Sequence, residues 1–217
     1  MPHLPPSTPL APEATSTTIL DRPVNSGPGR LVVLTGPSGV GKGTLLHRLR
    51  AKYPDLYVST SATTRSPRPG EVHAKDYYFL DHPTFEGLIA EGQLLEWAEF
   101  AGNYYGTPRQ PVEEQIRQGQ QVILEIELEG ARQVAKTCPD ALRIFIAPPS
   151  TAELERRIRG RGQDTDAAIA RRLARAPVEI AAASEFDVQI VNDDCDRAVA
   201  TLEAILFPSP QGSTLPR

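Results

Sequence analysis

The residues best suited to chemistry lie in a glycine-rich stretch that includes a lysine. Gly36, Gly41 and Lys42 have the spacing Gly-x4-Gly-Lys, after the apolar run 31–34 and before helix-forming residues. Glycines let the backbone adopt positive φ and turn N–H groups toward an anion, and the N-terminus of the following helix adds its dipole. The lysine supplies a mobile positive charge for the terminal phosphates of a nucleotide. This order of strand, loop, lysine and helix favours a phosphate-binding loop over an ordinary glycine-rich turn.

One position departs from the common form of this motif. Ser or Thr usually follows the lysine, and its hydroxyl contacts Mg²⁺. Here Gly43 follows Lys42, and Thr44 comes one residue later. We expect Thr44 to approach the metal, directly or through water; the alternative is a bond from its hydroxyl to the helix backbone. The residues of the predicted loop are Gly36, Pro37, Ser38, Gly39, Val40, Gly41, Lys42, Gly43 and Thr44.

A second candidate phosphate site is a loop with two arginines. Arg65 and Arg68 stand three positions apart and are framed by Pro67, Pro69 and several hydroxyl residues. Guanidinium groups bind phosphate through two parallel hydrogen bonds, and prolines stiffen the loop that presents them. The alternative is a solvated basic loop.

Glutamates at strand positions are the next candidates. Glu125 and Glu127 close an apolar strand expected over 121–127, and the period of two places them on the same face. In phosphate-loop enzymes a carboxylate at this place contacts the metal or its waters, so Glu125 joins Thr44 as a metal candidate; simple solvation is the alternative. Glu96 or Glu99, in the strand expected over 94–100, is a candidate for facing a pocket, although solvent exposure is the default for both.

Arginines are concentrated in the segment 150–175. Seven of them fall within 20 residues, more than solubility requires: Arg156, Arg157, Arg159, Arg161, Arg171, Arg172 and Arg175. Gly160 and Gly162 would allow this segment to move. We interpret it as a mobile cationic lid over a polyphosphate, with an exposed charged helical face as the alternative.

Strands and helices are expected to alternate along most of the chain. Further strands are predicted at 56–61, 142–147 and 187–191, and helices at 45–52, 111–118, 131–136 and 196–206. This alternation is typical of an α/β fold with a mainly parallel sheet flanked by helices. Ligands bind beyond the carboxyl ends of the strands in such sheets. The phosphate loop, the two glutamates and Asn192 all fall at those ends.

Residues 61–107 interrupt the alternation and predict a small β-rich lobe. It would contain strands at 76–80 and 94–100, a short helix at 83–91, and a turn at 102–107 that carries two tyrosines. The predicted division of the chain is a core (30–60 and 108–207), this lobe, a lid at about 150–175, and tails at 1–29 and 208–217.

Bulk composition limits the class of protein. The 217 residues suit one domain, and 40% hydrophobic content supports a real core. The net charge of −4 gives no sign of a nucleic-acid or anionic-membrane surface, and no apolar run approaches a membrane span. Two cysteines without metal-binding spacing fit a reduced, cytoplasmic setting. The first 30 residues hold 7 of the 21 prolines and predict a disordered tail.

Taken together, these segments resemble the guanylate kinase family over about residues 30–207. The matching pieces are Gly-Pro-Ser-Gly-Val-Gly-Lys, Thr-Thr-Arg-Ser-Pro-Arg-Pro-Gly-Glu-Val, Gly-Asn-Tyr-Tyr-Gly-Thr, Arg-Gly-Arg-Gly and Ile-Val-Asn-Asp-Asp. The first piece is shared with many NTPases, whereas the second and third, in this order, are far more specific. The resemblance implies a phosphate-loop kinase that converts ATP and GMP into ADP and GDP with Mg²⁺. It implies no nucleic-acid or membrane partner and leaves the oligomeric state open.

The resemblance also implies roles for individual residues. The acceptor nucleotide, GMP, would be bound by Ser61, Arg65, Arg68, Tyr77, Glu96, Tyr105, Thr107, Glu125 and Glu127. Among these, Glu96 and Thr107 would read the guanine. The phosphate would be held by Ser61, Arg65, Arg68, Tyr77 and Tyr105. Asn192 would contact ATP on its adenine side. The catalytic residues would be Lys42, Arg65, Arg157, Arg161 and Arg172.

The chain departs from the family pattern in one strand, where Glu125 and Glu127 replace the frequent Asp-x-Asp. The longer side chains reach about one methylene further, which implies a sheet set slightly back or a more water-mediated metal contact. Two alternatives to a GMP kinase are a non-catalytic binding module of the same fold and a kinase for another acceptor such as AMP. The intact phosphate loop argues against the first. A regulatory GTPase would need an Asn-Lys-x-Asp motif, which the sequence lacks.

Overall fold

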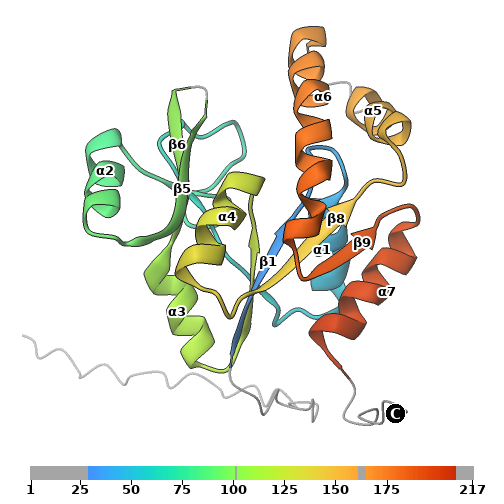
Figure 1. Ribbon diagram of the computed structural model, residues 1–217. Coiled ribbons are helices and arrows are strands. Elements are labelled where there is room, and N and C mark those ends of the chain that lie inside the picture. Colours follow the sequence, from blue (N-terminus) through green and yellow to red (C-terminus); the bar gives the residue numbers. More distant parts are fainter. Residues whose placement is uncertain (1–28, 101, 161–164, 209–217) are drawn as a thin grey trace, which may run out of the picture.

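The computed structural model describes residues 29–100, 102–160 and 165–208, which form two sheets and their covering helices (Figure 1). The larger sheet has five strands, all parallel to their neighbours. In spatial order they are β2 (Tyr57–Val58), β7 (Gln121–Glu125), β1 (Arg30–Thr35), β8 (Leu142–Ala147) and β9 (Val188–Val191). The predicted parallel α/β architecture is therefore confirmed.

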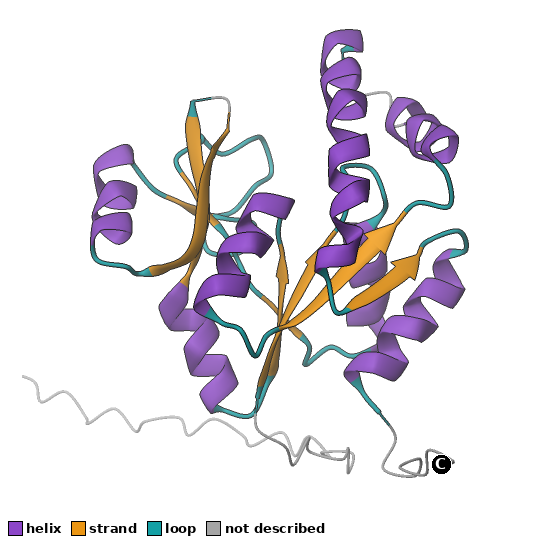
Figure 2. Ribbon diagram, in the orientation of Figure 1, coloured by secondary structure: helices purple, strands orange, loops and turns teal. Residues whose placement is uncertain are grey.

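Helices cover both faces of the larger sheet (Figure 2), which explains why its strands are nearly continuous apolar runs. Along β1, Val32 and Leu34 face one hydrophobic cluster, and Leu31 and Val33 face another. The first cluster includes residues of α1 (Lys42–Lys52), α5 (Thr151–Gly160), α6 (Asp166–Ala181) and α7 (Cys195–Leu206). The second includes residues of α3 (Arg109–Arg117) and α4 (Leu128–Thr137).

The smaller sheet lies to one side of the core and is mixed (Figure 1). Its order is β4 (Tyr78–Phe79), β3 (Ala62–Thr63), β6 (Asn103–Pro108) and β5 (Leu94–Phe100), so β5 is an edge strand. The helix α2 (His82–Ala90) covers it with the fully buried Phe85. Asp81 caps this helix by accepting a hydrogen bond from the Thr84 amide at 2.8 Å.

Several predicted bounds differ from the structure, and two regions differ most. The expected turn at 102–107 is the strand β6, because Tyr104 and Tyr105 pair with β5 on one side and Tyr105 pairs with β3 on the other. The strand expected over 121–127 ends at Glu125, and Glu127 is the N-cap of α4. That helix begins at Leu128, three residues before the predicted start, and includes Gly130.

Parts of the predicted organisation lie outside the described residues. These are the tails, apart from Gly29 and Pro208, and the lid residues 161–164. The boundaries between core, lobe and lid stay predictions. Within the described ranges, no helix is long and apolar enough to cross a bilayer.

Core packing generates a first prediction. Leu49 is 0% exposed on α1, so Leu49→Ala should lower the free energy of unfolding by about 2–5 kcal/mol through lost burial and a residual cavity. Val178, on α6, is 65% exposed. Val178→Ala should therefore change the free energy of unfolding by less than about 0.5 kcal/mol. Urea unfolding of both variants measures the difference; equal effects would contradict the packing.

Candidate active site

The glycine-rich loop between β1 and α1 is shaped by close backbone contacts. Gly36 has φ 148°, and a Cβ there would lie 2.2 Å from the carbonyl oxygen of Ile146 on β8. Gly41 has φ 105°, and a Cβ there would lie 2.7 Å from Nδ2 of Asn192. Both positions therefore exclude a side chain on conformational and steric grounds.

Lys42 begins α1 and is buried. Its Nζ donates a hydrogen bond of 2.6 Å to the carbonyl oxygen of Gly36, which spans the loop from its end to its beginning. The positive charge expected at the loop is thus held over it by the loop's own backbone. A bound anion at this place would gain a charge-assisted partner without a large movement of the chain.

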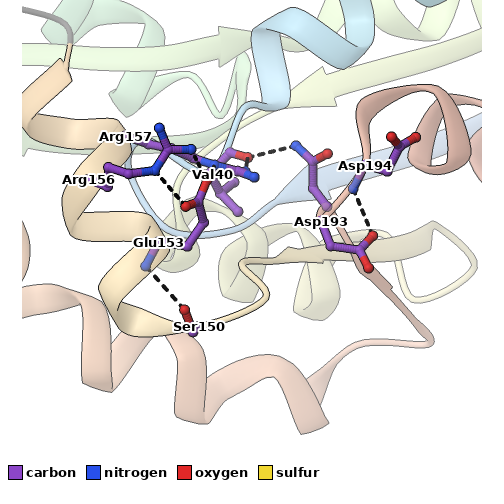
Figure 3. Close-up of polar contacts among 8 residues, drawn as sticks. Val40, Ser150, Glu153, Arg156, Arg157, Asp193 and Asp194 are labelled. Atoms are coloured by element: carbon purple, nitrogen blue, oxygen red, sulfur yellow. Dashed lines mark hydrogen bonds and ion pairs between the residues drawn. The ribbon is translucent and has the colours of Figure 1, made fainter.

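The carbonyl oxygen of Val40 joins the loop to two distant segments (Figure 3). Asn192, which follows β9, donates to it from Nδ2 at 2.8 Å. Arg157 on α5 donates to it from Nη1 at 3.2 Å. Asn192, predicted on the adenine side of ATP, and Arg157, predicted as a catalytic lid arginine, therefore both contact the loop directly.

A carboxylate orients the lid arginines in this arrangement. Glu153 accepts hydrogen bonds from Arg156 and, at 2.8 Å, from Nε of Arg157 (Figure 3). The bonds from Arg156 and then Arg157 lower the pKa of Glu153 to about 2. Ser150 caps α5, since the Glu153 amide donates to Oγ of Ser150 at 3.1 Å. The Glu153 side chain, however, binds the arginines.

The second lid helix also contacts the loop. Arg172 on α6 donates from Nη1 to Oγ of Ser38 at 3.3 Å. Arg161, the remaining lid arginine predicted to be catalytic, lies outside the described residues. Two of the three lid arginines predicted to be catalytic, Arg157 and Arg172, are therefore in contact with the phosphate loop.

The predicted acceptor-phosphate residues gather in the smaller lobe. The Arg65 guanidinium lies 5.5 Å from the ring centroid of Tyr77, and the Tyr77 and Tyr105 rings are 6.3 Å apart. Arg65 forms two hydrogen bonds to Glu71, at 3.0 and 2.9 Å, and the Arg68 amide donates to the same carboxylate at 2.7 Å. These hydrogen bonds lower the pKa of Glu71, and the contribution from Arg65 is the largest.

Glu96 and Thr107 form a buried polar pair. Glu96 is 7% exposed, and its Oε1 accepts a hydrogen bond of 2.6 Å from the Thr107 hydroxyl. Burial raises the pKa of Glu96, and the bonds from Thr107 oppose this in part. Glu99, the other candidate in β5, is exposed. A buried carboxylate with one satisfied oxygen can accept hydrogen bonds from a bound base.

Glu125 and Glu127 do not act on one face as predicted, because the strand ends between them. A Cβ on Gly43 would lie 3.8 Å from Oε1 of Glu125. Gly43 and Glu125 both line a cavity of about 480 Å³ beside α1. Burial, and after it Tyr105, raise the pKa of Tyr77; Glu71 and Glu125 add smaller contributions, and Arg65 opposes them. Glu127, after burial, raises the pKa of Glu179 on α6.

Comparison with known proteins decides the family. The guanylate kinase family model matches residues 28–209. A guanylate kinase of Thermosynechococcus vestitus is 64% identical over 184 residues, which cover 84% of this chain and 96% of that protein. One from Synechococcus sp. strain JA-3-3Ab is 56% identical over 206 residues, covering 95% and 94% respectively. The chain belongs to the guanylate kinase family.

A solved structure agrees with this assignment. The crystal structure of guanylate kinase from Anaplasma phagocytophilum matches with a TM-score of 0.64 at 35% identity, covering 82% of this chain and 84% of that one. The family, the fold and the enzyme class predicted from the sequence are confirmed. The activity is that of a guanylate kinase, a nucleotide kinase that converts ATP and GMP into ADP and GDP.

Two acids of this guanylate kinase site were missed from the sequence. Glu71 belongs to the arginine loop, but its distance of six positions from Arg65 gives no sign in the sequence of the bond between them. Glu179 is buried on α6, where burial and Glu127 raise its pKa while Arg175, at 3.7 Å, and Lys42 act in the opposite direction. Its signal was weak, because a lone glutamate on a charged helix is usually solvated.

The loop geometry generates a prediction for this guanylate kinase. Gly36→Ala should destabilise the fold by about 2 kcal/mol or more and abolish ATP binding, because the new Cβ meets the Ile146 carbonyl at a positive φ. Gly87→Ala is the control: on α2 its Cβ would meet nothing within 4 Å, so a gain of roughly 0.5–1 kcal/mol is expected. Thermal unfolding and calorimetric ATP titration measure both; normal ATP binding by Gly36→Ala would contradict the loop geometry.

Proposed function

We propose that the chain transfers the γ-phosphoryl group of ATP to GMP across the junction between the phosphate loop and the smaller lobe. The observation that carries this proposal is that cations gather in two places: Lys42, Arg157 and Arg172 on the loop, and Arg65 beside Tyr77 and Tyr105 in the lobe. A donor phosphate would bind at the first place and an acceptor phosphate at the second. In-line phosphoryl transfer requires that the two phosphates be brought face to face.

On the donor side, the chain's cations would stabilise the transferred group. Lys42 would exchange the Gly36 carbonyl for phosphate oxygens, and Arg157 and Arg172 would turn from the loop toward the developing charge. Arg161 is assigned the same role from its motif alone. Asn192 would stay on the Val40 carbonyl and support the adenine side. Charge stabilisation of this kind supplies most of the catalysis in phosphoryl transfer, with little covalent chemistry from the protein.

On the acceptor side, the GMP phosphate would replace a carboxylate. Arg65 now holds Glu71 through a two-bond contact, and a phosphate dianion offers the same geometry with more charge. Arg68, Tyr77, Tyr105 and Ser61 would complete the phosphate contacts. The GMP phosphate is already ionised at neutral pH, so no separate general base is required.

Selection of guanine would come from Glu96 and Thr107. Guanine presents N1–H and the 2-amino group as adjacent donors, and one carboxylate can accept from both. Adenine offers no such pair, so binding it would leave a buried charge unpaired, which discriminates strongly. The kinase for another acceptor such as AMP is the alternative that this pocket disfavours.

The residues present fit a magnesium ion carried by ATP. Mg²⁺ is usually bound by one or two carboxylates together with substrate phosphates, and the Glu125 carboxylate lies where the loop lacks its usual hydroxyl. Thr44 and Glu125 would hold the ion or its waters. When bound, the ion would neutralise part of the negative charge of the ATP phosphates. Within the described ranges, no group of three or more His, Cys, Asp or Glu side chains forms a separate metal site.

We also propose a cytoplasmic location. Cys138 and Cys195 are both free thiols, which suits a reducing compartment.

The donor assignment is tested with a coupled ADP-release assay. ATP with GMP should release ADP, and ATP with AMP, CMP or UMP should not. Lys42→Ala should lower kcat by about 100-fold or more, the scale for losing one transition-state partner. Lys52→Ala, an exposed position on the same helix, should leave kcat unchanged. Near-normal turnover in Lys42→Ala would contradict the role of Lys42 at the donor site.

The acceptor assignment is tested with Glu96→Gln. The charge that reads guanine is lost, so kcat/KM for GMP should fall sharply, and the acid limb of its pH profile should disappear. Because burial raises the pKa of Glu96, the wild-type protein loses stability as pH rises through that pKa. The free energy of unfolding of Glu96→Gln should therefore exceed that of the wild type by roughly 1 kcal/mol at pH 7. The difference should be smaller near pH 5. Unchanged GMP use in the variant would overturn the assignment.

A further inference from the structure

A single side chain of the core holds the strand that carries Glu96. Gln133 on α4 accepts a hydrogen bond from the Trp97 amide at Oε1, 3.1 Å away. Its Nε2 donates to the Trp97 carbonyl oxygen at 2.8 Å. A primary amide has one acceptor and two donors, so Gln133 binds β5 as a neighbouring strand residue would.

Trp97 lies beside an irregular point of β5. On its other side β5 pairs with β6, and the register shifts between Leu94 and Trp97. The shifted part contains Leu95 and Glu96. An irregularity of this kind re-aims a side chain away from the regular alternation. The direction of Glu96 is therefore not set by the ladder with β6 alone.

The same face of α4 also makes room for the Glu96 carboxylate. A Cβ on Gly130 would lie 2.5 Å from Oε2 of Glu96. Gly130 and Gln133 are three residues apart, so both are on one side of the helix. Thr107 holds the other oxygen, Oε1, at 2.6 Å. One carboxylate is thus positioned by Thr107 within the lobe and by α4 from the core.

The contact crosses from the core to the smaller lobe. Ala131 and Val134 of α4 belong to a core cluster with Val33 of β1, and Leu95 of β5 joins that same cluster. Figure 1 shows α4 beside β5, between the two sheets, and the two elements pack together. Leu95 anchors the strand in the core, and Gln133 holds the residue two positions later.

We propose that Gln133 is a positioning residue for guanine selection, which fixes the irregular segment of β5 so that Glu96 meets the acceptor base. The proposal rests on the role of Glu96 given above. In this role Gln133 would act through the Trp97 backbone rather than on the substrate. Loss of its two bonds frees Trp97 and lets the adjacent carboxylate shift. A shift of about 1 Å in a polar partner can reduce catalysis by up to about 100-fold.

Two variants test the proposal in acceptor assays with GMP and with IMP, which lacks the 2-amino group. Gln133→Ala removes both bonds to Trp97. Gly130→Ala drives a methyl group into Glu96, while alanine itself favours the helix. Both should lower kcat/KM for GMP by about 10-fold or more, reduce the preference for GMP over IMP, and leave KM for ATP unchanged.

A matched control separates this effect from general damage. Gln118, at the end of α3, is exposed and bonds to Glu114 at 2.8 Å. Gln118→Ala should behave as wild type in every assay. A fall in kcat for all acceptors, or a raised KM for ATP, in Gln133→Ala and Gly130→Ala would overturn the proposal in favour of a merely structural role.

Tryptophan fluorescence provides a readout that does not depend on activity. Trp97 is the only tryptophan of the chain and is 37% exposed. Gln133→Ala should shift its emission to longer wavelength and increase its quenching by acrylamide, whereas Gln118→Ala should do neither. Unchanged emission and quenching in Gln133→Ala would show that the amide does not hold the strand and would overturn the proposal.

Glu96→Gln in the same assays distinguishes the failure of this inference from that of the proposed function. If Glu96→Gln lowers the preference for GMP over IMP but Gln133→Ala and Gly130→Ala do not, only the inference falls. If Glu96→Gln leaves that preference unchanged, the guanine-reading role fails and the inference fails with it.

Discussion

The close approach of the phosphate loop to its surroundings is the constraint on which the rest of the site depends. Gly36 and Gly41 allow the loop backbone to pack against β8 and Asn192, at distances that exclude a Cβ. This packing fixes the Val40 carbonyl, which then receives Asn192 from the last strand and Arg157 from the lid. The carboxyl end of the sheet and the lid therefore meet the loop at one backbone carbonyl oxygen, which both side chains share.

The cations of the site are paired with internal carboxylates in this arrangement. Glu153 holds Arg157, and Glu71 holds Arg65. Each pair lies at a partly exposed position, where an ion pair contributes little to stability. Exchange of a carboxylate for a phosphate therefore costs little and keeps each guanidinium oriented before the substrate arrives. Glu96 is different, because it is buried and its charge is costly until a base supplies donors.

Local patterns made much of this fold predictable. The strands at 94–100 and 142–147 have the predicted bounds, because apolar runs and alternation mark them directly. The strand at 103–108 was missed because Gly102 and Asn103 indicate a turn, whereas its pairing with β3 is non-local. The start of α4 was missed because Gly130 reads as a break, and only its contact with Glu96 explains a glycine inside a helix. Glu179 was missed for a similar reason, since Ser38 and Lys42, which act on its pKa, lie more than 100 positions away along the chain.

The amide of Gln133 has a consequence beyond the site. Strand β5 is the edge of the smaller sheet and exposes large side chains, including Phe100, which is 61% exposed. An open edge with apolar residues is a template on which another chain can add a strand and start aggregation. At Trp97 both backbone groups are already occupied by the Gln133 side chain. One glutamine thus closes the middle of this edge to self-association without adding a strand.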